Sequence, residues 1–126
     1  MSDITSTYIT IDETFLTHFS MGKLASLDGI NITVNMSFRK INGDSSTMHR
    51  IGNIAEQYRP NSSIKYTYTY CPNTPFNNII QTNIYNININ DITNNLIIES
   101  DGDMFIKPDI SYVDGSITSF NLSYTI

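Results

Sequence analysis

The sequence predicts an all-β fold, an antiparallel β-sandwich with jelly-roll-like connections and about eight strands. First, several segments alternate apolar and polar residues with a period of two, which is typical of strands with one buried face. Second, tight-turn signals separate these segments, as at Asp28-Gly29, Asn42-Gly43 and Asp101-Gly102. Third, no segment of helical period is long enough to count as a helix. Short strands joined by such turns favour a sandwich.

The size of the chain fits one domain. With 126 residues it should bury roughly two thirds of its unfolded surface, so residues 1–126 are interpreted as a single sandwich. Cys71 is the only cysteine, so no disulfide can close within the chain. We interpret it as a small core or turn residue beside Pro72 rather than as a reactive thiol.

The first strand is expected in the alternating segment from Tyr8 to Asp12. An apolar patch around His18 follows, made of Phe15, Leu16 and Phe19. Met21-Gly22 then breaks the pattern. We interpret His18 as a packing or capping residue, because no second His, Cys or carboxylate stands at metal-site spacing from it.

The clearest strand follows the Asp28-Gly29 turn and ends at Phe38. Its inward face is predicted to hold the apolar residues Ile30, Ile32, Val34, Met36 and Phe38. Its outward face is predicted to hold Asn31, Thr33, Asn35, Ser37 and Arg39. Asn42-Gly43 predicts a hairpin, because a type I′ turn needs positive φ at both central residues. The returning strand is expected near residues 47–51.

Proline fixes a corner at Tyr58-Arg59-Pro60, before the next long strand. One helical turn at most is expected just ahead of it, within residues 53–57. In that strand Ile64, Tyr66, Tyr68 and Tyr70 share one face. We expect these tyrosines to pack in the core or against a neighbouring subunit.

The last third of the chain predicts further strands. Two prolines make residues 72–75 a loop. The change of parity within 79–90 fits either a β-bulge near Ile84 and Tyr85 or a strand that bends from one sheet into a second, and we favour the bend. Asn94-Asn95 is expected to turn the chain, and Asp101-Gly102 to join residues 96–99 to 104–106 as a hairpin. After Asp114-Gly115, a final strand is predicted to point these residues inward: Thr118, Phe120, Leu122, Tyr124 and Ile126.

The composition excludes several function classes. A net charge of -5 leaves no basic face for phosphates, so nucleic acid is not an expected partner. No apolar run approaches the ~20 residues of a membrane span, and no signal peptide begins the chain, so we expect a soluble protein without membrane insertion. No nucleophile, metal or nucleotide motif is present, so we expect neither an enzyme nor a cofactor. A surface of Asn, Ser, Thr and Tyr suits hydroxyl-rich ligands, although an AT-rich genome would enrich some of these residues too.

A resemblance sharpens this expectation. Several segments of the chain are similar to those of receptor-binding head domains of tailed-phage baseplate and tail-fibre proteins. They are the alternating strand 30–38, the segment Arg50–Ile54 running into Tyr58-Arg59-Pro60, the strand 63–70, the Asp101-Gly102 hairpin and the closing strand 116–126. The resemblance covers about the last hundred residues. It implies a jelly-roll homotrimer at the tail tip of the virion, contacts with other phage tail proteins and binding of bacterial cell-surface saccharide. Residues 1–25 would then be an N-terminal strand and a connection from a longer fibre.

Candidate ligand-binding residues are polar or aromatic groups expected near turns: His49, Tyr85, Asp101, Asp103 and Tyr112. The chain has no Trp, so stacking on a sugar ring would fall to Tyr or His. Asp101-Gly102-Asp103 lacks the remaining ligands of a calcium loop, so we interpret it as a turn. Two alternatives stay open: a structural trimeric cap or connector of a phage tail without a ligand, and a C1q- or TNF-like sandwich that binds protein.

Overall fold

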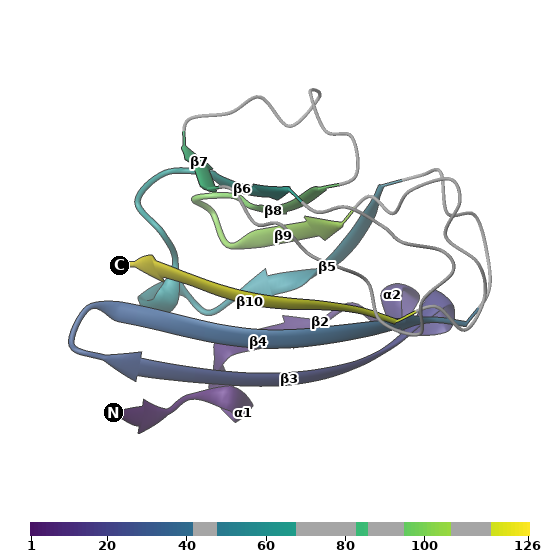
Figure 1. Ribbon diagram of the computed structural model, residues 1–126, viewed down its shortest axis with the longest axis horizontal. Coiled ribbons are helices and arrows are strands. Elements are labelled where there is room, and N and C mark those ends of the chain that lie inside the picture. Colours follow the sequence, from purple (N-terminus) through teal and green to yellow (C-terminus); the bar gives the residue numbers. More distant parts are fainter. Residues whose placement is uncertain (42–47, 68–82, 86–94, 107–116) are drawn as a thin grey trace.

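Two antiparallel sheets packed face to face make up the fold, which confirms the predicted β-sandwich (Figure 1). The computed structural model describes residues 1–41, 48–67, 83–85, 95–106 and 117–126. The four-stranded sheet has the order β1 (Ser2–Asp3), β3 (Phe19–Asp28), β4 (Asn31–Lys40) and β10 (Ile117–Thr125). The six-stranded sheet has the order β2 (Ile9–Ile11), β5 (His49–Ile54), β9 (Asp103–Ile106), β8 (Asn95–Ile98), β6 (Ile64–Thr67) and β7 (Asn83–Tyr85). The described residues thus form ten strands where about eight were predicted.

A long hairpin of β3 and β4 forms the centre of the four-stranded sheet. Its turn lies at the predicted Asp28-Gly29, where Gly29 has a φ of 64°. Ile30 belongs to this turn rather than to the strand, and 59% of it is exposed, so its predicted place in the core is wrong. The remaining predicted inward residues of this strand are buried: Ile32, Val34, Met36 and Phe38.

In the segment before β3, the strand expected at Tyr8–Asp12 is present as β2, but the rest differs from its prediction. The chain forms the short helices α1 (Thr5–Tyr8) and α2 (Glu13–His18), and Met21-Gly22 lies within an unbroken β3. Phe15 and Phe19 are four residues apart, so they share one side of the α2 end, and their rings stack with centroids 4.8 Å apart. That buried pair holds α2 against the start of β3. A single 3-10 turn, η1 (Glu56–Tyr58), lies close to the one turn expected near residues 53–57.

The predicted hairpin between β4 and the strand near residues 47–51 does not form. That strand is β5, and it pairs with β2 and β9 in the other sheet. The reason is that β3 and β10 already occupy both edges of β4. The chain therefore crosses between the sheets after β4.

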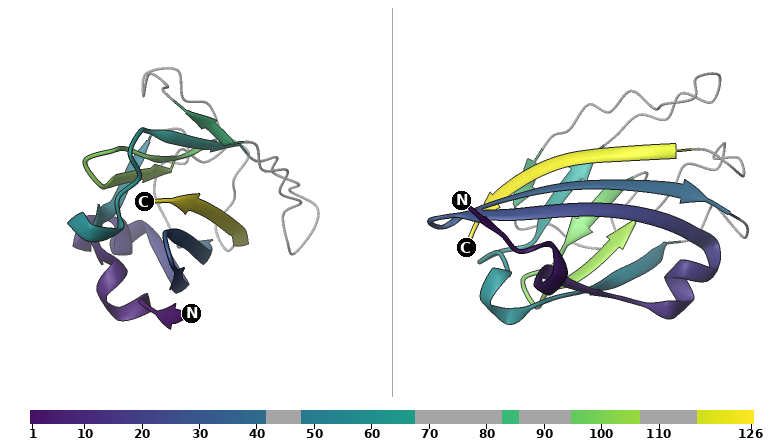
Figure 2. Two further views of the ribbon diagram at one scale, coloured as in Figure 1. Left: turned by 90° about the vertical axis from the view of Figure 1, so that its left-hand side faces the viewer. Right: turned by 90° about the horizontal axis from the view of Figure 1, so that it is seen from below.

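The core lies between the sheets, which Figure 2 shows as two layers (left). Alternate residues of β10 confirm the predicted pattern, with Phe120, Leu122 and Tyr124 buried and the residues between them exposed. From the six-stranded sheet these residues face them: Ile51, Ile54, Ile64, Tyr66, Leu96, Ile98, Met104 and Ile106. The Asp101-Gly102 turn joins β8 to β9 as predicted.

Tyrosine hydroxyls connect the two sheets inside this core. Tyr66 of β6 donates to the backbone carbonyl of Ser123 in β10 at 3.0 Å. Tyr124 of β10 donates to the carbonyl of Tyr58 at 2.6 Å, so the hydroxyl of Tyr8, 2.8 Å away, donates to Tyr124. Burial raises the pKa of Tyr8 well above its ordinary value of 10.0 and also raises that of Tyr124. The expectation that Tyr66 packs in the core is confirmed.

Several expectations fall outside the described residues. They concern the turn at Asn42-Gly43, the side chains of Tyr68 and Tyr70, Cys71, the proline loop, the parity change apart from β7, and Asp114-Gly115. The jelly-roll connections involve these segments and stay a prediction. Asn95, expected in a turn, is the first residue of β8.

Gly52 marks a point where two backbones touch. It lies opposite Ile11 in the pairing of β2 with β5, and a Cβ atom on it would overlap the backbone carbonyl of Thr10. Gly22, also within a strand, would place a Cβ 3.2 Å from the flexible side chain of Ser37 and near no backbone atom. The two glycines therefore tolerate a methyl group differently.

We expect Gly52→Ala to lower the free energy of unfolding by about 2 kcal/mol or more, because β2 must move away from β5. Gly22→Ala is the matched control and should leave stability unchanged or raise it by about 0.5 kcal/mol, since alanine restricts the unfolded chain. Urea unfolding followed by circular dichroism measures both. Equal stabilities of the two variants would contradict this account of β2 and β5.

Candidate functional site

The outer face of the four-stranded sheet carries uncharged side chains, all of them polar except Leu24 and the bare position Gly22. We call it the polar sheet face, and its described members on β3, β4 and β10 are Ser20, Gly22, Leu24, Ser26, Asn31, Thr33, Asn35, Ser37, Asn121, Ser123 and Thr125. Strand alternation places them here, because the residues between them point into the core. Most of them are exposed. The face thus offers hydroxyl and amide groups to solvent.

The strand register arranges these groups in rows. Leu24, Asn35 and Asn121 are direct neighbours across the three strands. The next row holds Ser26, Thr33 and Ser123. Adjacent strands lie about 4.8 Å apart and alternate residues of one strand about 6.7 Å apart, so donors and acceptors repeat at short spacing in both directions.

On β3 and β4 the described charges of this face lie only at its ends, while Asp3 of β1 stands beside Ser26 at its margin. Asp28 stands at the β3–β4 turn and Arg39 near the opposite end of β4, where it pairs with Ser20. No described residue between these two positions on the outer face of β3 and β4 is charged. The centre of the face therefore suits a ligand that is neutral and polar.

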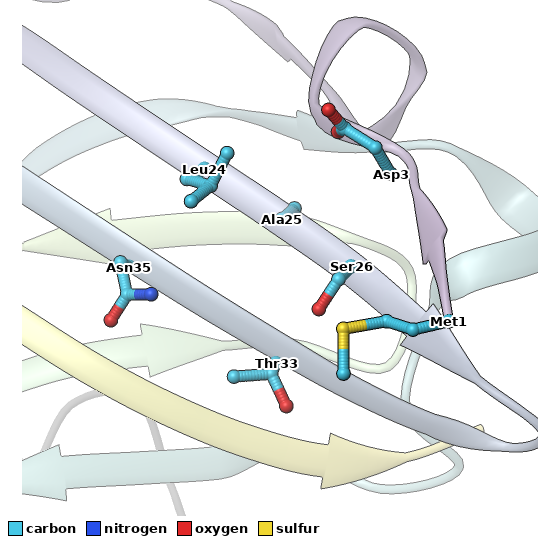
Figure 3. A pocket seen from close by; sticks show the side chains of 7 residues that line it. All are labelled: Met1, Asp3, Leu24, Ala25, Ser26, Thr33 and Asn35. Atoms are coloured by element: carbon cyan, nitrogen blue, oxygen red, sulfur yellow. The ribbon is translucent and has the colours of Figure 1, made fainter.

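A hollow of about 460 Å³ lies on this face beside β1 (Figure 3). Leu24 and Ser26 border it from β3, and Thr33 and Asn35 from β4. The side chain of Met1 reaches over it from the β1 side. Pockets for small ligands commonly have volumes of about 300 to 1,000 Å³, so this hollow, which we call the larger hollow, has room for a sugar ring.

Asp3 adds a carboxylate at the margin of the larger hollow. The hydrogen bonds of Thr5, including a 2.8 Å bond from its backbone N–H to Asp3 Oδ1, lower the pKa of Asp3. The group is therefore an acceptor at neutral pH. Its second oxygen can accept a hydrogen bond from a ligand hydroxyl.

Three of the predicted binding residues lie elsewhere, with His49 and Asp103 on the six-stranded sheet and Asp101 in its β8–β9 turn. His49 begins β5, and its ring lies 5.3 Å from those of His18 and Phe19, measured between centroids. The packing role interpreted for His18 agrees with this contact. The structure thus brings together two histidines that the sequence analysis treated separately.

Asp101 and Asp103 are close to each other and to Arg50. The Asp101 carboxylate accepts the backbone N–H of Asp103 at 3.0 Å, as in a turn. Asp103 Oδ1 accepts hydrogen bonds from Arg50 Nη2 at 2.6 Å and from Asn53 at 2.8 Å. Arg50 Nη1 also donates to both carboxylate oxygens of Asp12, at 2.6 and 2.8 Å. These bonds join β9 and β5 to the start of α2.

Two predicted site residues have no described side chain. Tyr85 lies in β7 opposite Ile64, and only its backbone is described. Tyr112 lies outside the described residues. Neither can be placed with respect to His49 or the aspartates.

Alternation in the sequence predicted the outward residues of the polar sheet face on β4 and β10, but it predicted no strand at β3 and none of these residues was selected as a site. Their signal was the polar half of the alternation in β4 and β10. The pairing of β4 with β3 and β10 brings these residues together into one candidate site. Alternation within a single strand does not reveal that pairing.

Comparison with known proteins adds no assignment, because no protein-family description, curated protein or solved structure matches this chain. Within the described residues, no three His, Cys, Asp or Glu side chains are grouped so that they could hold a metal ion. The helices in that part of the chain are all too short or too polar to cross a membrane.

We expect acid to destabilise the fold partly through Asp103. Burial raises the pKa of Asp103, but the hydrogen bonds from Arg50 and Asn53 lower it by more, so the pKa lies below its ordinary value of 3.8. The folded state thus binds this proton less readily than the unfolded chain. The stabilisation is present above the unfolded pKa, around pH 4, and is lost as pH falls through the folded pKa.

Asp103→Asn should therefore lose less stability than the original chain between pH 6 and pH 2.5, as measured by urea unfolding at each pH. Asp28→Asn, at the exposed β3–β4 turn, removes the same charge away from Arg50 and is the matched control. An Asp103→Asn profile that parallels the original chain would contradict the role given to this network.

Proposed function

We propose that this protein is a non-catalytic recognition domain that binds bacterial cell-surface saccharide through the polar sheet face. The observation that supports this most is the set of exposed hydroxyl and amide groups over β3, β4 and β10, which Leu24 and Gly22 of β3 interrupt without adding charge. The similarity of its segments to phage receptor-binding head domains suggests the setting, a tail fibre or baseplate of a virion. In that setting the protein recognises the host as a homotrimer joined to other tail proteins.

The chemistry of the larger hollow fits a sugar ring. Sugar hydroxyls both donate and accept hydrogen bonds, and so do the hydroxyls of Ser26 and Thr33 and the amide of Asn35. Leu24, which is 56% exposed, provides an apolar contact for the C–H side of a ring. Short polar side chains on a rigid sheet also lose little entropy on binding.

A protein partner fits the same face less well. Stable protein interfaces have an apolar core surrounded by polar groups. On the polar sheet face Leu24 is the one large apolar residue among the described members, and polar residues surround it. Leu24 and the exposed Met1 beside the larger hollow supply less apolar area than such a core requires.

Each site would bind weakly, and repetition would supply the strength. A millimolar site is worth only about -4 kcal/mol, because hydrogen bonds to sugar replace hydrogen bonds to water. Several copies held together raise the apparent affinity by about 10²-fold or more without new contacts. The proposed trimer would serve this purpose.

A structural role in the tail is the second candidate. Leu16, Ile41 and Met48 are exposed large apolar residues that belong to the segments meeting at the His18–His49 contact. A neighbouring tail subunit could cover them. A connector of this kind would assemble with other copies or tail proteins but would bind no saccharide.

We expect the combined substitution Thr33→Val and Asn35→Leu to abolish binding to an array of bacterial envelope saccharides. The new side chains keep nearly the same shape but remove the hydrogen-bonding groups of β4, at about 0.5 to 1.5 kcal/mol for each bond lost. Thermal unfolding should show that the fold is kept, since both positions are exposed strand sites.

The matched control is Thr10→Val with Asn61→Leu, which makes the same two changes at exposed positions away from the face. It should bind as the original chain does. Absence of any binding by the original chain to the array and to whole bacterial envelopes would favour the connector. An equal loss of saccharide binding in the control would contradict the assignment of the binding site to β4.

A further inference from the structure

Gly22 is a glycine that the fold itself does not require. Among the glycines that the structure describes, Gly29 and Gly102 have positive φ, and Gly52 touches the backbone of Thr10. Gly22 has neither feature, and it lies in the middle of the ten-residue strand β3. Glycine inside a strand costs about 0.5 to 1 kcal/mol relative to alanine. A missing side chain at such a position often marks close approach by a ligand or another chain.

A second, smaller hollow lies where this side chain is missing. It has a volume of about 150 Å³, and Ser20, Gly22, Ser37 and Arg39 of the polar sheet face border it. Ser37 lies opposite Gly22 and Arg39 opposite Ser20. The smaller hollow therefore offers two hydroxyls and one guanidinium around a bare stretch of backbone.

The two hollows lie in line along the same pair of strands. The larger hollow extends along β3 from Ser26 to Leu24, and the smaller one lies at Gly22. Leu24 and Gly22 are about 7 Å apart, whereas Ser26 and Gly22, four residues apart, are separated by about 13 Å. Leu24 stands between these positions on the same face. A single sugar ring cannot reach across both, but a short chain of sugars can pass over Leu24 and enter each.

From this arrangement we propose that the polar sheet face binds an extended saccharide of two or more sugars, with one unit in the larger hollow and another over Gly22. The inference rests on the proposed function and adds the ligand's length and direction to it. The unit over Gly22 contacts the backbone of β3 closely and accepts hydrogen bonds from Arg39 and the serines. The remaining contacts lie at Thr33 and Asn35.

Gly22→Val tests this proposal, because valine fills the smaller hollow and suits a strand. The probe is an array carrying neutral envelope saccharides, each displayed as a series from the monosaccharide to the hexasaccharide. The original chain should bind longer members more tightly than the monosaccharide. Gly22→Val should lose about tenfold on the longer members and nothing on the monosaccharide, and Gly22→Ala should lose less.

Thr10→Val places the same valine at an exposed strand position of the other sheet and is the control. If Gly22→Val folds and binds every length as the original chain does, the second subsite is refuted while the proposed function stands. If the original chain binds no saccharide of any length, both the second subsite and the proposed function are refuted. If Gly22→Val instead loses self-association in sedimentation measurements while its saccharide binding is unchanged, the smaller hollow binds a second copy of the chain, and the proposal is overturned.

Discussion

Hydrogen bonds from buried tyrosine hydroxyls tie the two sheets together. Which face of each strand points into the core and which points to solvent depends on these bonds. Tyr66 reaches from β6 to the backbone of β10, and Tyr124 reaches from β10 to the carbonyl of Tyr58. Apolar burial alone is not directional and would tolerate sliding of one sheet over the other. A hydroxyl that loses its acceptor in the core is costly, so these bonds favour one alignment.

That alignment decides which surface is available for recognition. With Phe120, Leu122 and Tyr124 turned inward, the alternate residues Asn121, Ser123 and Thr125 must point outward. The same holds for β4, so a slip of one residue would exchange core and surface on both strands. The proposed binding surface is therefore formed by the strand residues that alternate with those of the core.

Sequence periodicity was sufficient for part of this picture. Alternation correctly placed Ile32 to Phe38 and Phe120 to Tyr124 because those strands have one buried face. It failed at Ile30, where the Asp28-Gly29 turn uses one more residue than the pattern suggests. It also failed at β5, because the choice of sheet depends on which strand edges are free, and neighbouring residues do not record that. Phe15 and Phe19 show a further limit, since a helix of six residues is stabilised by burial against β3 rather than by a recognisable helical period.

The candidate site shows the same division. Polar residues of β4 and β10 were identified as outward facing, yet the sequence alone directed attention to His49, Asp101 and Asp103 on the other sheet. There the Asp103 carboxylate accepts hydrogen bonds from Arg50 and Asn53, and the Asp101 carboxylate accepts the backbone N–H of Asp103, whereas Thr33 and Asn35 are exposed beside a hollow. The decisive information was the register of β3, β4 and β10, which joins three separate polar patterns into one surface.

The most direct test of this account is a nuclear magnetic resonance titration of the ¹⁵N-labelled protein with the saccharide that binds most strongly on the array. The account predicts that amide shifts concentrate at Gly22, Leu24, Ser26, Thr33 and Asn35, with little change on β5 and β9. Shifts concentrated at His49, Asp101 and Asp103 instead would contradict it.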